Sequence, residues 1–155
     1  MRKVSVCNLR PESRGTVHVS GRDVAAAPEI RPNYLSTPGD RLLAAKSIRH
    51  ARSLMATSAI ARFRPQEMLP GREFETDDEL IRRAGDIATT IFHPVGTCKM
   101  GSDPKAVVDA KLSVHGLGKL RVVDASIMPT IVSGNTNSPV IMIAEKAADS
   151  IVGVR

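Results

Sequence analysis

Aromatic residues are scarce in this chain of 155 residues, which has three Phe, one Tyr and no Trp. Proteins that bind single-stranded nucleic acid stack the bases on aromatic side chains, so the sequence lacks the platform that such a protein needs. The core has to be built from Val, Ile, Leu, Met and Ala. A sizeable core is still feasible, because hydrophobic residues make up 42% of the chain.

Cysteines and long apolar runs are also few. Cys7 and Cys98 lie far apart and form no disulfide framework, so reduced thiols are the default. No apolar run approaches the roughly 18 residues of a membrane span. The first residues, MRKVSVCNLRPESRG, lack the apolar stretch of a signal peptide. We therefore predict a soluble, cytoplasmic protein with no membrane span.

Basic residues exceed acidic ones, and the formal net charge is +6. Four of them fall on one predicted helix: Arg41, Lys46, Arg49 and Arg52. Such a face is typical of a solvated surface or of contact with another protein segment, and we expect no nucleic-acid partner. A non-enzymatic basic binding module, for nucleic acid or a protein, is the alternative function, and charge alone favours it.

Short strands are predicted in the first half and again near residue 115. Residues 4–9 and 15–20 alternate apolar and polar side chains around a turn-rich link, a pattern that predicts a β-hairpin. Residues 26–40 contain three prolines and should form an extended surface connection. Residues 107–124 indicate short strands joined by a glycine turn at Gly116 and Gly118.

Three helices are predicted from their start signals. Thr37 caps a helix that runs to about residue 61, with Pro38 at its first position. Thr76 and Glu79 form a capping box that opens a helix to about residue 90. The last helix begins at Asn137 or at the next residue. We predict an α+β fold, an antiparallel sheet with packed helices, in a single domain over residues 1–155 because no linker interrupts it.

The segment FHPVGTCKMG, residues 92–101, has the densest set of reactive side chains. Pro94 and Gly96 prevent a helix from continuing through it, so His93 lies on a loop. An imidazole suits proton abstraction near neutral pH, but a loop histidine that only hydrogen-bonds to the backbone fits the pattern as well. The four histidines and two cysteines lack the spacing of metal ligands, so we predict no metal site.

Two further positions are candidates for ligand contacts. Asn135 and Asn137 precede the last helix, where asparagine is commonly a cap or turn residue. The same helix start offers backbone N–H groups and a positive dipole end to an anionic or carbonyl-rich ligand. Asp124 ends the apolar run LRVVD, and either a ligand contact or a turn role fits it.

Taken together, these segments resemble the glucose–methanol–choline (GMC) oxidoreductases. The run HPVGTCKMG, followed by residues 107–152, looks like the C-terminal signature of that family. NLRPESRGTVHVSGRD, followed by PEIRPNYL, resembles its substrate-domain hairpin. The resemblance covers nearly the whole chain and is closest to the choline dehydrogenase and alcohol dehydrogenase branch. It implies the substrate-domain and C-terminal portion of an FAD-dependent enzyme that oxidises a primary alcohol to an aldehyde by hydride transfer to FAD.

The resemblance also implies roles for individual residues. His93 matches the base that accepts the proton of the substrate hydroxyl. Asn135 matches the second active-site residue, which would hydrogen-bond the substrate oxygen. Asp124 and Ala125 match a turn that contacts the flavin. Thr136 and Asn137 match backbone contacts to the flavin ring.

One part of the family pattern is absent from this sequence. The N-terminal FAD-binding part, with its GxGxxG motif, has no counterpart, and HGLGKLR has Arg121 at the third glycine position. We expect tight FAD binding to require that missing segment or a complementing subunit. The isolated chain should be inactive, and self-association through the exposed interface is expected.

Overall fold

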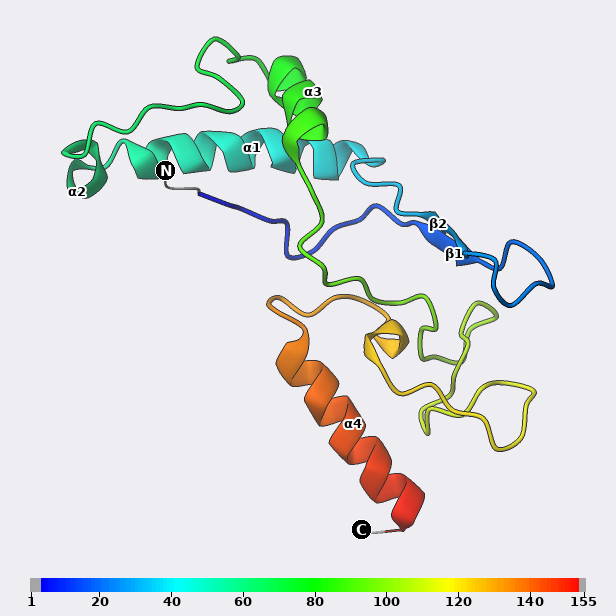
Figure 1. Cartoon of the computed structure of the whole chain (residues 1–155). Helices are drawn as coiled ribbons and strands as arrows, with labels where there is room; N and C mark the ends of the chain where they lie inside the picture. The colour runs from blue at the N-terminus through cyan, green and yellow to red at the C-terminus, as the bar shows by residue number, and fades with distance from the viewer. Residues whose placement is uncertain (1–3, 154–155) are drawn as a thin grey trace. The chain divides into compact units, whose positions relative to one another are not determined.

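The computed structural model describes residues 4–153, which form two compact units, one ending at Ile91 and the other beginning at Phe92 (Figure 1). The first unit contains β1 (Thr16–His18), β2 (Glu29–Arg31), α1 (Pro38–Met55), α2 (Ser58–Ala61) and α3 (Asp77–Ile87). The second contains a 3₁₀ turn, η1 (Ala125–Ile127), and α4 (Asn137–Val152). Helices with a two-stranded antiparallel sheet confirm the predicted α+β class.

The hairpin has a different partner from the one predicted. β1 pairs with β2, Thr16 opposite Arg31 and Val17 opposite Ile30, so the pairing with residues 4–9 is wrong. Residues 26–40 likewise contain a strand and are more than an extended connection. The strands predicted within residues 107–124 are reduced to isolated bridges, such as Val108 with Val114.

The helix starts agree with the sequence, and some of the ends do not. Thr37 Oγ1 accepts a hydrogen bond from Asp40 N at the start of α1, and the reciprocal capping box of Thr76 and Glu79 opens α3. α4 begins at Asn137, as predicted. α1 stops at Met55 rather than near residue 61, because Thr57 begins the separate short helix α2. α3 stops at Ile87, three residues early.

Asp40 anchors the segment just before β1 to the start of α1. Its buried carboxylate accepts hydrogen bonds from the main-chain N–H groups of Glu12 (3.0 Å) and Ser13 (2.7 Å), from Ser13 Oγ (2.5 Å) and from Asn8 Nδ2 (2.9 Å). Two main-chain donors just before β1, those of Glu12 and Ser13, are therefore satisfied by one side chain instead of a neighbouring strand. Burial by itself would raise the pKa of Asp40, but the Ser13 and Glu12 hydrogen bonds lower it overall below its usual 3.8.

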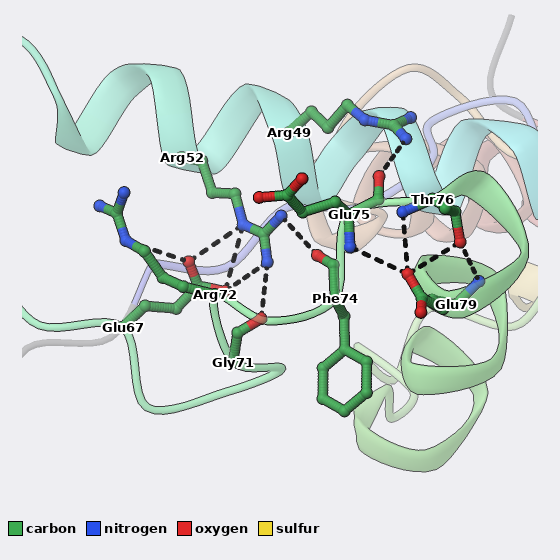
Figure 2. Close-up of polar contacts among 9 residues, drawn as sticks. All are labelled: Arg49, Arg52, Glu67, Gly71, Arg72, Phe74, Glu75, Thr76 and Glu79. Atoms are coloured by element: carbon green, nitrogen blue, oxygen red, sulfur yellow. Dashed lines mark hydrogen bonds and ion pairs between the residues drawn. The ribbon is translucent and has the colours of Figure 1, made fainter.

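Arg52 holds the long connection between α2 and α3 against α1. Its guanidinium pairs with Glu67, 2.8 Å from Oε1, and donates to the carbonyl oxygens of Gly71 (2.8 Å) and Phe74 (2.9 Å), as Figure 2 shows. Arg49, one turn earlier, bonds to Asp77 and to the carbonyl of Glu75. Because α1 contacts α3 directly, these bonds close the first unit around its helix pair.

This use of arginines removes most of the basic face that favoured a nucleic-acid or protein-binding module. Arg49 and Arg52 have the partners just described, and Arg41 donates to the carbonyls of Leu35 and Ser36. Of the four basic residues on the helix, only Lys46 has a side chain with no hydrogen bond or ion pair to another residue within 4–153. The structure gives no support to the alternative function.

The cores are small, and much apolar surface is exposed. Ala45, Leu80 and Ala84 are buried where α1 meets α3. The second unit buries Val108, Ile127, Met128 and Ala147. On α4, by contrast, Ile141, Met142, Ile151 and Val152 are each more than half exposed. Within residues 4–153, no helix combines the length and apolar character that crossing a bilayer demands.

Replacing Asp40 tests its role in the first unit. We expect Asp40→Asn to lower the free energy of unfolding of the 155-residue chain by about 2–4 kcal/mol, because an amide NH₂ would face N–H donors. The lowered pKa makes the contribution complete above about pH 5 and lost as the pH falls below about 4. Denaturant unfolding measured from about pH 7 to 3 should show that the difference in unfolding free energy between wild type and Asp40→Asn becomes smaller as the pH falls. The exposed Asp78→Asn serves as control, with a loss below about 1 kcal/mol. A difference in unfolding free energy that did not change with pH would contradict the role of the ionised Asp40 carboxylate as acceptor.

Arg52 and Arg49 form a matched pair on one helix. Arg52→Ala should cost about 2–4 kcal/mol, since it leaves Glu67, whose side chain is 13% exposed, with only the longer 3.9 Å contact to the exposed Arg72. Arg49→Ala should cost less than about 1 kcal/mol, since its ion pair with Asp77 is half exposed. Denaturant unfolding of both variants compares them, and equal losses would show that burial of the ion pair does not matter.

Candidate functional site

The loop of His93 is bonded to the turn that precedes α4. Cys98 N donates to Ser126 O (3.0 Å) and Met100 N donates to Ile127 O (2.8 Å). Gly96 lies between His93 and these bonds with φ of +85°, and a Cβ there would be 3.2 Å from Met128 O. Glycine is therefore required for the loop to approach the turn this closely. The predicted loop of residues 92–101 follows one defined path.

The His93 ring is half-buried and has a side-chain partner. Its Nδ1 lies 2.8 Å from Oγ1 of Thr136, which is 6% exposed. The interpretation in which His93 merely bonds to the backbone does not match this contact. Phe92, just before it, has φ of +63°, a conformation that bulky residues rarely adopt and that is often found at functional sites. Within residues 4–153, Nε2, the other ring nitrogen, has no hydrogen-bond partner.

Thr136 and Asn137 form the beginning of α4. The main chain of Thr136 is helical (φ −89°, ψ −5°), and no side chain caps the helix. Val140 N is the donor to Thr136 O, and Pro139 has no N–H. In the described part of the chain, the amides of Asn137 and Ser138, in the first turn of α4, have no side-chain acceptor at this positive end of the helix dipole.

Asp124 and Ala125 form the turn to which the His93 loop is bonded. Asp124 Oδ1 accepts from Ser126 N (2.7 Å) and from Ser126 Oγ, and Ala125 is the first residue of η1. The carboxylate of Asp124 thus stabilises the turn itself. A ligand contact from these two residues would have to come from the main chain or from the remaining carboxylate oxygen.

Asn135 is exposed, and its side chain makes no hydrogen bond to His93 or to any other residue within 4–153. The structure places it next to Thr136, so it is one residue from the partner of His93. Sequence reasoning identified Thr136 for its backbone only and missed its hydroxyl. A threonine before a helix is normally read as a cap, so no local signal indicated the contact. Nor does any group of three metal-ligating side chains gather in the described part of the chain.

Comparison with known proteins identifies the family. The model of the GMC oxidoreductase C-terminal domain matches residues 11–144. The chain belongs to the GMC oxidoreductase family. Among relatives, it is 46% identical over 147 residues to "Alcohol dehydrogenase [acceptor]" of Pseudomonas putida, covering 95% of this chain and 27% of that protein. It is 45% identical over 150 residues to an oxygen-dependent choline dehydrogenase of Proteus mirabilis, with coverage of 97% and 27%.

Solved structures of GMC flavoenzymes share the fold. A pyridoxine 4-oxidase from "Mesorbium loti" superposes with a TM-score of 0.85 and 38% identity, over 90% of this chain and 27% of that one. A fungal aryl-alcohol oxidase gives a TM-score of 0.81 and 30% identity, over 94% and 24%. The chain thus spans about a quarter of the length of the relatives that it matches.

Gly96 provides a local test of the loop. Gly96→Ala should destabilise the chain by about 1–2 kcal/mol, since it adds a Cβ at positive φ against Met128 O. Hydrogen exchange at the amides of Cys98 and Met100 should accelerate roughly 5- to 30-fold, because local opening becomes easier. Gly118→Ala is the control, as a Cβ there meets nothing within 4 Å. Unchanged exchange in Gly96→Ala would contradict the proposed constraint.

Proposed function

We propose that this chain is the substrate-domain and active-site portion, residues 1–155, of an FAD-dependent alcohol dehydrogenase of the choline dehydrogenase type. The single observation that carries the proposal is the fixed imidazole of His93 beside the uncapped start of α4. The relatives named choline and alcohol dehydrogenase support the reaction class, oxidation of a primary alcohol to an aldehyde.

The proposed chemistry needs a base and a hydrogen-bond donor at one oxygen. His93 accepts the hydroxyl proton of the alcohol at Nε2, the nitrogen that Thr136 does not occupy. Asn135 donates its amide N–H to the same oxygen and, having no titratable group, keeps that role at every pH. FAD, when bound, supplies the acceptor for the hydride of the carbinol carbon.

The residues present fit the ring end of FAD. The amides of Asn137 and Ser138 lie at the positive end of α4 with no side-chain acceptor, which suits a carbonyl-rich ring that gains negative charge on reduction. Thr136 and Asn137 would contact the ring through the main chain, and Asp124 and Ala125 would border it from η1. These contacts would hold only the ring end of FAD.

The adenosine diphosphate end of FAD has no counterpart in the sequence, since no GxGxxG opens a helix. We propose that tight binding needs an FAD-binding segment or complementing subunit and that the isolated chain is inactive. The exposed apolar residues of α4, such as Ile141 and Met142, are the surface that such a segment or a second copy would cover.

Complementation tests the proposal. The 155-residue chain is mixed with the separately produced FAD-binding segment of a GMC relative, and flavin absorbance and dye reduction with choline or a simple primary alcohol are measured. Bound flavin and dye reduction are expected only in the mixture. A mixture that binds flavin but reduces no dye with any alcohol would overturn the reaction class.

His93→Gln should lower kcat of the complemented enzyme by about 10²- to 10⁴-fold, the factor that a positioned general base contributes, with flavin absorbance retained. The same substitution at exposed His50, on α1, is the control and should change kcat less than about twofold. If His93→Gln and His50→Gln were equally active, His93 would not be the base.

A further inference from the structure

Every α-helix within residues 4–153 begins after a threonine, and one of the four hydroxyls bonds to a side chain far away in the sequence. Thr37 and Thr76 accept a hydrogen bond from the amide three residues on, at 3.2 and 3.3 Å. Thr57 donates to the carbonyl of Leu54 in the preceding turn. Thr136 bonds to a side chain 43 positions earlier, the ring of His93.

The main chain of Thr136 also differs from that of the other three threonines. Thr37, Thr57 and Thr76 have the extended conformation of an N-cap residue, with ψ of 149°, 148° and 157°. Thr136 has ψ of −5°, which is helical. A side chain on a helical residue does not reach back to the amides of its own first turn, so the hydroxyl of Thr136 does not accept from α4.

The direction of the bond between Nδ1 and Oγ1 decides which ring nitrogen can take a proton. If the hydroxyl donated, the neutral ring would hold its proton at Nε2, and Nε2 could not act as acceptor. If Nδ1–H donates, the lone pair of Nε2 is open. The lone pairs of Thr136 Oγ1 accept no amide from α4, so they are available to Nδ1–H.

We propose that Thr136 is a positioning residue, which accepts Nδ1–H of His93 and so leaves Nε2 as the proton-accepting atom. Its catalytic consequence rests on the proposed function, whereas the tautomer itself does not. Because Thr136 is buried at the start of α4, the same contact fixes the ring relative to the amides of Asn137 and Ser138. A base on one loop and the end of one helix are thereby held together by a single hydroxyl.

Nitrogen chemical shifts of the histidine rings measure the tautomer directly. The 155-residue chain is labelled with ¹⁵N-histidine and studied at a pH where the imidazoles are neutral, and His93→Gln assigns the His93 signals. His115 provides an internal reference in the same spectrum. Its Nε2 lies 3.0 Å from the carbonyl of Gly101, which can only accept, so His115 must carry its proton on Nε2.

We expect His93 to show the opposite tautomer from His115, with the proton on Nδ1. Thr136→Ser keeps the hydroxyl and should keep that tautomer. Thr136→Val keeps the shape and removes the acceptor, so the ratio of the two His93 tautomers should fall roughly fivefold, the factor of one ordinary hydrogen bond. Thr76→Val removes a helix-start hydroxyl from α3 and should leave His93 unchanged while it lowers stability.

In the complemented enzyme, Thr136→Val should lower kcat by roughly the same fivefold with KM little changed, and Thr136→Ser should restore it. A proton on Nε2 of His93 in the wild type, or a tautomer ratio that Thr136→Val leaves unchanged, overturns the inference even if alcohols are oxidised. The expected tautomer without alcohol oxidation leaves the inference in place and removes the proposed function.

Discussion

The two main-chain hydrogen bonds from Cys98 to Ser126 and from Met100 to Ile127 are the contact on which the candidate site depends. They hold the loop of His93 against the η1 turn, and Gly96 permits the approach because a side chain there would meet Met128 O. A base must be held near one position to be effective, since misplacement of about 1 Å can be costly in rate.

At three places in the chain, aspartate side chains accept main-chain hydrogen bonds that a neighbouring strand would accept in a regular sheet. Asp40 satisfies the segment before β1, and Asp124 shapes the η1 turn. Asp109 Oδ1 accepts from Lys111 N (2.8 Å) and Ser113 N (2.9 Å), and the Ser113 bond is the main cause that lowers the pKa of this carboxyl. Carboxylates therefore organise loops that in a larger sheet would be held by neighbouring strands, and their ionised form is the one that the fold uses.

Arg52 and Thr136 each have a specific role that their residue type and position in the sequence do not indicate. Arg52 is bonded to Glu67 and to two carbonyls, so this basic side chain of α1 holds its own unit together. The Thr136 side chain does not cap α4, so the positive end of that helix has no cap from this residue. In both cases a feature that looks generic in the sequence acquires a specific partner through the fold. A ligand with partial negative charge would be stabilised at such an end.

The sequence alone determined the starts of α1, α3 and α4, the α+β class and the family, because these depend on neighbouring residues or on the order of motifs. The caps of Thr37 and Thr76 involve residues only three positions apart. Tertiary structure decided the rest. β1 pairs with β2 rather than with residues 4–9, and Asp40 accepts hydrogen bonds from residues 27 to 32 positions away. His93 bonds to Thr136, 43 positions away. The sequence named both partners in that last pair, but a hydroxyl before a helix can cap it or turn away. Only the helical main chain at Thr136 decided between these outcomes.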